Sequence, residues 1–379
     1  MSAEGMEYSA ADIKVLDGRE AVRKRPGIYV GSTGQHGLHQ LVLDVVDRAV
    51  NQVLTGRVGS VDVTLTSDGG VRVVDDEVAG GETYAPDLEE ELTSSYVGSR
   101  PRSRRSTAVV GLFVANALSS RLTAEVRGAG LRWAKEYARG VEVDPPVTVG
   151  SATGSGTTIS FWPDTEIFET TSCSFAVLAR WCRQLAFLNR GLAISLTDER
   201  PVHGPRRVLF QFPDGVRDFV AALDAETGVA LQSDVFGFER EDPRMAGTME
   251  VALLWSGSGE AGIRGFVNSR ATREGGTHVD GFRDGVVAAV TEFARERGLP
   301  APSDPDACAE RIGEGLTAVV SVKLDQPEFL GATCELLGNA EVRVCVGEAV
   351  REHLGNWFAE HPERAAEIVN RIVRGRDLD

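Results

Sequence analysis

The stretch from residue 39 to residue 54 reads HQLVLDVVDRAVNQVL, and it decides the architecture expected for the first half of the chain. Its apolar residues follow the i, i+3, i+4, i+7 spacing of a helix that buries one face, at Val42, Val45, Val46, Ala49, Val50 and Val53. Asp44, Asp47, Arg48 and Asn51 fall off that stripe. We therefore expect an amphipathic helix that ends at Gly56 and keeps its polar side chains away from the buried face.

Strand patterns follow this helix. Alternating runs at 60–66 and 70–74, joined by Asp68-Gly69, predict a β-hairpin. Other strand-like runs occur at 121–126, 132–137, 157–162, 192–197, 247–255, 263–267 and 317–323. Helical stretches occur among them at 111–118, 175–188, 215–223, 280–297 and 359–374. The sequence thus predicts an α+β protein with a first domain at 1–206 and a second at 207–379, divided near Gly204-Pro205.

Residues 77–105 have no such periodicity and form a long, polar connection with segregated charges. An acidic run at 87–91 precedes the basic run of Arg100, Arg102, Arg104 and Arg105. Connections of this length are usually functional or disordered. The arginines could bind an anion, DNA or an acidic partner, or lie solvated on the surface. Neutralisation by the acidic run is the interpretation that we favour.

Composition and charge exclude several classes of protein. The chain has 379 residues, of which 42% are hydrophobic and 25% charged, as in globular proteins. It has neither an apolar run of membrane-spanning length nor a secretory signal, so we expect a cytoplasmic protein without membrane contacts. The five cysteines are scattered, which indicates neither a disulfide framework nor a metal site. The net charge of −16 argues against broad binding to nucleic acid.

Several long segments resemble the ATPase subunits of bacterial type IIA topoisomerases, the DNA gyrase B family. They are 15–33 (VLDGREAVRKRPGIYVGST), 37–46 (GLHQLVLDVV), 116–119 (NALS), 186–200 (AFLNRGLAISLTDER), 268–282 (NSRATREGGTHVDGF) and 315–323 (GLTAVVSVK). The resemblance implies a GHKL (Bergerat) α/β sandwich followed by a transducer domain with a ribosomal-S5-like fold. The family's Toprim and tail domains are expected to be missing, so the chain is not expected to be a complete topoisomerase.

The resemblance assigns roles to three residues of the first domain. Asp44 takes the position of the glutamate that polarises the attacking water, and it is one methylene shorter. A retreat of about 1 Å costs on the order of 100-fold in rate. Arg48 replaces the asparagine that holds Mg²⁺, so a cation stands where a cation should bind, and no metal is expected. Asp75 takes the position of the aspartate that bonds adenine.

Other positions of the family's site are altered as well. Glu77 and Ala79 replace the glycines that follow the adenine aspartate, and the lid at 105–111 (RSTAVVG) retains only Gly111. Cys334 stands where a transducer lysine would reach the γ-phosphate. The nucleotide-binding positions that could persist are Asp75, Thr157 and Gly111.

Asp44 and Arg48 are four residues apart on one helix, and this spacing predicts that they pair with each other. Arg48 then either replaces the metal against a phosphate or closes an idle pocket, and we favour the closed pocket. Tyr8 and Ile13 lie on the arm that, in the family, straps across the other protomer of a dimer. Their retention is consistent with dimerisation or with the needs of the fold alone.

Three functions remain open on this basis. The first is a non-hydrolysing regulatory paralogue without a cofactor, which forms a homodimer, or a heterodimer with a gyrase B-type subunit, and acts on a gyrase or gyrase–DNA complex. The second is a weak ATPase module of a type IIA topoisomerase that uses ATP and Mg²⁺ in changing DNA topology. The third is a pocket adapted to another ligand. The loss of the lid glycines favours the first.

Overall fold

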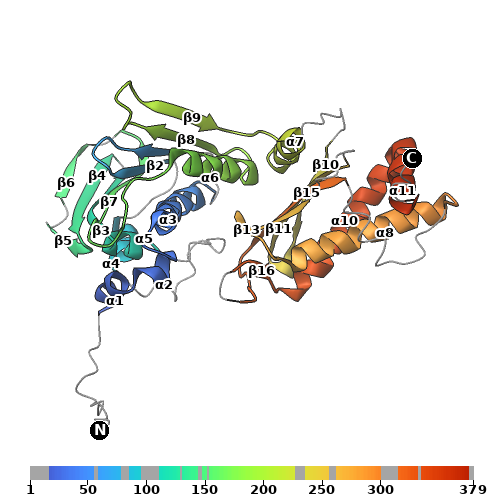
Figure 1. Cartoon of the computed structure of the whole chain (residues 1–379), viewed down its shortest axis with the longest axis horizontal. Helices are drawn as coiled ribbons and strands as arrows, with labels where there is room; N and C mark the ends of the chain where they lie inside the picture. Colours follow the sequence, from blue (N-terminus) through green and yellow to red (C-terminus); the bar gives the residue numbers. More distant parts are fainter. Residues whose placement is uncertain are drawn as a thin grey trace, which may run out of the picture. The chain divides into compact units, whose positions relative to one another are not determined.

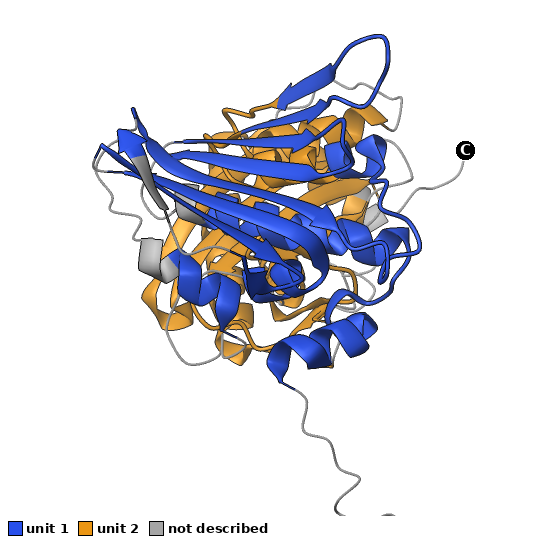
Figure 2. Ribbon diagram, turned by 90° about the vertical axis from the view of Figure 1, so that its left-hand side faces the viewer, with its two compact units in different colours: residues 1–100, 108–180, 194–209 blue, residues 101–107, 181–193, 210–379 orange. Residues whose placement is uncertain are grey.

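The structure is a computed structural model of the chain (Figure 1). It describes residues 17–54, 59–77, 85–94, 111–128, 130–143, 147–151, 153–226, 235–255, 262–299, 315–331 and 334–374. The chain forms two compact units, one of residues 1–100, 108–180 and 194–209, the other of residues 101–107, 181–193 and 210–379 (Figure 2). The main division therefore falls just after residue 209, close to the boundary expected after residue 206.

The first unit is built on a nine-stranded sheet with the order β5-β4-β3-β7-β2-β1-β8-β9, in which β6 also pairs with β4. The strands are β1 (Ser60–Leu65), β2 (Val71–Glu77), β3 (Ser119–Gly128), β4 (Leu131–Ala138), β5 (Val141–Glu142), β6 (Val147–Ser151), β7 (Ser155–Pro163), β8 (Ala193–Asp198) and β9 (Arg206–Phe210). The predicted hairpin is confirmed, because β1 and β2 pair antiparallel with Leu65 opposite Val71.

Six helices occur among the described residues of this part of the chain. They are α1 (Gly18–Lys24), α2 (Pro26–Val30), α3 (Gln35–Leu54), α4 (Ala85–Thr93), α5 (Leu112–Ala117) and α6 (Phe175–Leu188), whose second half belongs to the other unit. Of these, α3 and α5 pack directly on the sheet. The predicted amphipathic helix is confirmed as α3, which begins at Gln35 and packs on β1 and β2. Its stripe of Val42, Val45, Val46, Ala49 and Val50 is at most 3% exposed.

The expectation of a long connection without periodic structure at 77–105 is wrong in its middle, because α4 lies there. Leu88 and Leu92, one helical turn apart, are buried at 1% and 0% exposure. With only these two apolar residues in an acidic segment, the pattern was too weak to indicate a helix from sequence alone.

The second unit is built on a five-stranded sheet of order β10-β11-β15-β12-β13, with the small pair β14–β16 beside it. Its strands are β10 (Phe236–Asp242), β11 (Gly247–Trp255), β12 (Ile263–Val267), β13 (Arg270–Thr272), β14 (Gly275–Gly276), β15 (Leu316–Leu324) and β16 (Leu336–Leu337). Its helices are α7 (Val216–Glu226), the short η2 (Pro243–Met245), α8 (Thr277–Glu296), α10 (Ala340–Glu360) and α11 (Pro362–Arg374).

Helices cover both faces of this second sheet. Val320 and Val322 of β15 belong to the core formed with α8, α10 and α11, whereas Val319 belongs to the core formed with α7. Because successive strand residues point to opposite faces, a strand covered on both sides is largely apolar and does not alternate between polar and apolar residues. This explains the continuous run LTAVVSVKL of β15.

The helices α8 and α10 approach each other closely at glycine residues. A Cβ atom on Gly285 of α8 would lie 2.6 Å from the carbonyl oxygen of Gly347 and 2.7 Å from Cβ of Val350, both on α10. Gly281, one turn earlier, faces the backbone of Arg343 in the same way. By contrast, a Cβ atom on Gly355 of α10 would meet nothing within 4 Å.

We predict opposite effects for two glycine substitutions in these helices. Gly285→Ala should lower the free energy of unfolding by about 1–3 kcal/mol, because the added methyl group forces the helices apart. Gly355→Ala, the matched control, should raise it by up to about 1 kcal/mol, because alanine is the better helix former. Urea unfolding followed by circular dichroism measures both, and equal effects of the two substitutions would contradict the close helix contact.

Candidate functional site

Two of the residues that the sequence assigns to a nucleotide site, Arg48 and Asp75, meet where α3, β2 and α4 come together in the first unit. Asp44 lies in α3 and is only 4% exposed, and its Oδ1 accepts a hydrogen bond from Gln40 Nε2 at 2.9 Å. Gln40 is one turn earlier on the same helix and was not singled out from sequence. It fixes the orientation of the carboxylate that stands at the expected general-base position.

Arg48 forms ion pairs with residues of two other elements. Its NH1 lies 3.2 Å from Asp75 Oδ2 on β2, and its Nε lies 3.1 Å from Glu91 Oε2 on α4. The three side chains are 11%, 7% and 14% exposed, so they form a largely buried cluster of one cation and two carboxylates. We call this the Arg48 cluster.

The Arg48 cluster corrects the pairing predicted from helix spacing. The i, i+4 rule favoured Asp44 as the partner of Arg48, whereas the ion pairs that the structure gives Arg48 run to Asp75 and Glu91. Asp75 lies on a neighbouring strand, and Glu91 lies 43 residues further along the chain. The long arginine side chain reaches both, and burial makes these contacts stronger than an exposed contact along one helix.

Both carboxylate oxygens of Asp75 have internal hydrogen-bond donors. Oδ2 accepts from Arg48, and Oδ1 accepts from the backbone N–H of Thr157 at 2.8 Å. Thr157 faces Asp75 directly in the register of β2 and β7. Burial raises the pKa of Asp75, and the charge of Arg48 and the N–H of Thr157 oppose that rise. The position that would bond an adenine amino group is therefore engaged by the protein itself.

Helix α4 is tied to the sheet by a second ion cluster. Lys135 of β4 has a side chain only 2% exposed, and its Nζ lies 2.6 Å from Glu89 and 2.9 Å from Glu142. Asn116 Nδ2 of α5 also donates to the carbonyl oxygen of Leu92, at 3.0 Å. These contacts hold α4 in the position from which Glu91 reaches Arg48.

The acidic run at 87–91 has partners within the first unit. Glu89 pairs with Lys135 and Glu91 with Arg48, because the α4 helix turns these two carboxylates toward β4 and α3. The expected neutralisation of the basic run at 100–105 stays a prediction. The basic run itself lies outside the described residues, as do Ala79, Tyr8 and Ile13.

The remaining predicted positions are distributed as follows. Glu77 is the last residue of β2, in register with Ser155 of β7. Gly111 precedes α5 with φ −70° and ψ 178°, an extended conformation. Cys334 belongs to the second unit, where it is partly exposed and has a positive φ of 56°.

One of the most recognisable segments, 15–33, has a scaffold role. Arg23 donates to the carbonyl oxygen of Ala117 at 2.8 Å and to Asp164 Oδ2 at 2.7 Å. The side chain of Asp164 is 2% exposed, and it also pairs with Arg139 at 3.3 Å. Burial disfavours the ionised carboxylate of Asp164 and so acts to raise its pKa. The N–H of Glu166 and the two arginines outweigh this effect, and the pKa of Asp164 is lowered. This network ties α1 to α5 and to the end of β7.

The described residues contain neither a metal-binding cluster nor a membrane-spanning helix. Within that part of the chain, no group of three or more His, Cys, Asp or Glu side chains is arranged to hold a metal ion. None of the helices in the described ranges has the length and apolar character needed to span a membrane. Arg48 occupies the position where the resemblance places the Mg²⁺ ligand, and its positive charge would repel the metal ion.

Comparisons with known proteins agree with this architecture. The DNA gyrase B family profile matches residues 215–377. The chain is 39% identical to the DNA gyrase B protein of Streptomyces coelicolor over 393 residues, which cover 97% of this chain and 57% of that protein. It is 37% identical to the DNA gyrase B protein of Mycobacterium leprae, of which it covers 60%. The chain thus spans somewhat more than half the length of these relatives.

Solved structures match over nearly their whole length. The 43K ATPase domain of Thermus thermophilus gyrase B, in complex with an aminocoumarin, has a TM-score of 0.80 and 31% identity, with 95% of this chain and 94% of that chain covered. The DNA gyrase B protein of Myxococcus xanthus has a TM-score of 0.77 and 27% identity, with 93% and 99% covered. The chain therefore belongs to the DNA gyrase B family, and it has the α+β fold of that family's GHKL ATPase region.

Proposed function

We propose that this chain is a gyrase B-type module that acts by binding and regulation rather than by ATP hydrolysis. The observation that carries the proposal is the Arg48 cluster, in which a buried guanidinium engages the aspartate expected to bind adenine.

The first argument concerns charge. A nucleotide site of this family needs Mg²⁺ beside the phosphates, because catalysis of phosphoryl transfer rests on positioning and charge neutralisation. Arg48 places a permanent positive charge at the position expected for the magnesium ligand. Two carboxylates, Asp75 and Glu91, hold that charge within 3.2 Å. A guanidinium fixed in this way repels a metal and leaves the metal no ligand there.

The second argument concerns the parts that would act on the phosphates. Asp44 is held by Gln40 and is one methylene shorter than the glutamate whose position it takes, and position comes before pKa for a general base. Cys334 offers a thiol where a lysine would neutralise the γ-phosphate. Only Gly111 of the lid glycines remains, and it is extended. Each change weakens hydrolysis, and none compensates for another.

The partner that we propose is a second gyrase B-type protomer, either another copy of this chain or a hydrolysing relative. Tyr8 and Ile13, on the N-terminal arm that straps across the other protomer in the family, support this part. Such a protomer would enter a gyrase or gyrase–DNA complex as a regulatory member. With a net charge of −16, its contact with DNA would be local or would come through the partner.

One observation favours the alternative, an ATP-binding and weakly hydrolysing module of a type IIA topoisomerase. The Thr157 hydroxyl is buried beside the Asp75 carboxylate, whose pKa it helps to lower, but it forms no hydrogen bond of standard geometry among the described residues. A buried polar atom of this kind is what a bound ligand or water would satisfy. In that case the nucleotide must first displace Arg48 from Asp75, so its affinity is reduced by the free energy of that pair.

Calorimetry with ATP separates these two functions. We expect the wild-type chain to give no saturable heat with up to about 1 mM ATP, with or without Mg²⁺, and no phosphate release. Arg48→Asn should give measurable ATP binding, because it frees Asp75 Oδ2. The same substitution at an exposed arginine, Arg72→Asn, is the control and should change nothing. Submicromolar ATP affinity of the wild-type chain together with turnover would overturn the proposal.

The energetic role of Arg48 has a separate test. Arg48→Met should lower the free energy of unfolding at pH 7 by about 3–5 kcal/mol, because it leaves two buried carboxylates uncompensated. Arg72→Met, which breaks the exposed Arg72–Glu199 pair, should cost less than about 1 kcal/mol. Urea unfolding of both variants measures the difference, and similar losses would show that the cluster is energetically unimportant.

The loss in Arg48→Met should also depend on pH. Burial raises the pKa of Asp75 in the folded protein, and removing the Arg48 charge that opposes this raises it further. A group with a raised pKa stabilises the folded state when protonated, and this stability is lost as pH rises through the folded pKa. The deficit of the variant should therefore shrink as the pH falls from 7 toward the pKa of Asp75. A deficit independent of pH would contradict this assignment.

The regulatory role is tested with purified proteins. We expect the chain to form a dimer in analytical ultracentrifugation, or to form a complex when mixed with a hydrolysing gyrase B protein. In that mixture, the ATP turnover of the hydrolysing protein should change with the amount of chain added. Bovine serum albumin at equal mass is the control. A monomer that leaves the turnover of the hydrolysing protein unchanged would contradict the regulatory role.

A further inference from the structure

We propose that a pocket in the second unit binds a small zwitterion, a molecule with an anionic and a cationic group joined by a short chain. The pocket has a volume of about 240 Å³ and lies among the end of α6, α7, β10 and β11. Five charged side chains line it, namely Arg190, Asp214, Arg217, Glu239 and Glu250. All of them belong to the same unit, and none belongs to the Arg48 cluster, so this inference is independent of the proposed function.

The first observation is that no close ion pair joins these five side chains. Among the described residues, none of them forms an ion pair within 4.0 Å. Other arginines of the unit do, for example Arg240 with Glu352 at 2.8 Å and Arg343 with Asp284 at 2.7 Å. Opposite charges that share a pocket without pairing leave their hydrogen-bonding capacity for a ligand.

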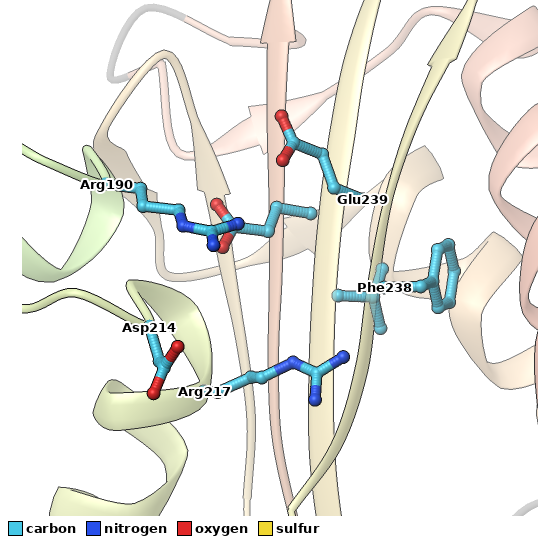
Figure 3. Close-up of a pocket in the computed structure, with 7 residues that line it drawn as sticks. Arg190, Asp214, Arg217, Phe238 and Glu239 are labelled. Carbon is cyan, nitrogen blue, oxygen red and sulfur yellow. The ribbon is translucent and has the colours of Figure 1, made fainter.

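The second observation is that backbone groups hold both arginines in place. Arg190 Nε donates to the carbonyl oxygen of Pro213 at 3.0 Å, and Arg217 donates to the carbonyl oxygen of Gly237. The stem of Arg217 lies against Gly237, where a Cβ atom would come within 3.1 Å of Arg217 Cγ and Nε. Figure 3 shows both arginines reaching from the helical side toward the strands, with Asp214 near them. Each guanidinium keeps further N–H donors for an anion.

The third observation concerns the carboxylates on the strands. Glu239 and Glu250 stand directly opposite each other in the antiparallel register of β10 and β11. Like charges in this position destabilise a sheet unless a cation lies near them. The Val216 N–H, at the start of α7, donates to Glu250 Oε1 at 3.3 Å and so fixes its orientation. Burial raises the pKa of Glu250, while that N–H, Lys323 and Arg190 oppose the rise.

The two sets of charges define the chemistry of the ligand. The arginine pair recognises a carboxylate, as guanidinium groups do with two or more N–H donors. The opposed glutamates recognise an ammonium group. A simple anion would leave the glutamates facing each other, and the described residues form no group of three that could hold a metal ion. A short ω-amino acid satisfies both sets at once.

A series of probes of increasing length tests this inference. The probes are glycine, β-alanine, 4-aminobutanoate and 6-aminohexanoate, and the monofunctional controls are propanoate and propylammonium. Binding to the full chain is measured by two-dimensional amide NMR titration. We expect one or two of the amino acids to bind at least about tenfold more tightly than either control, with shifts in α7 and β10. The preferred length reports the distance between the arginines and the glutamates.

Substitutions then assign the binding to this pocket. Arg217→Ala and Glu239→Gln should each weaken the best probe at least about fivefold. Arg240→Ala is the matched control, because Arg240 neighbours Glu239 on β10 but points to the opposite face and pairs with Glu352. Equal binding of propanoate and the amino acids would overturn the proposal. So would the absence of saturable binding up to about 50 mM, or an equal effect of Arg240→Ala.

Discussion

One buried guanidinium determines the geometry of the first unit where its function is expected. Arg48 joins α3 to β2 through Asp75 and to α4 through Glu91, and all three side chains are at most 14% exposed. Removing such charges from water costs several kcal/mol per ion, so each must keep a close partner of opposite sign. Because the three charged side chains come from three elements, none of these elements can shift without exposing or unpairing a charge. The second cluster, at Lys135, holds α4 in the same way.

Much of this architecture could be predicted from local patterns. The helix α3 followed from an apolar stripe with a period of 3.6 residues, and the hairpin β1–β2 followed from alternation around Asp68-Gly69. The run LTAVVSVKL indicated β15, although its lack of alternation reflects burial on both faces. These patterns are reliable because each shows, within a few consecutive residues, which side chains become buried when the chain folds. The gyrase B resemblance rested on the same kind of contiguous segments, and it is confirmed across the chain.

What could not be predicted depends on contacts between distant residues. Glu91 became important only through its contact with Arg48, 43 residues earlier, and no local pattern connects the two. Helix α10 was missed for a different reason. Its first turns carry Val342, Val344 and Val346, which alternate like a strand, while Val342, Cys345, Val346 and Ala349 also fit one buried helix face. The ambiguity was resolved by packing against α8, where glycines on both helices permit close contact.

The Arg48 cluster also indicates how the proposed non-hydrolysing protein would differ from one whose conformation responds to bound nucleotide. A ligand stabilises the state that it binds by an amount that grows with its concentration, so the protein can respond to nucleotide level. Arg48 supplies positive charge at the corresponding place as part of the chain, and its presence does not depend on any concentration. A nucleotide would first have to separate Arg48 from Asp75, and the free energy of that separation subtracts from its affinity. On the proposed function, the first unit is therefore held permanently in one conformation, which suits a protomer that offers a fixed binding surface rather than a switch.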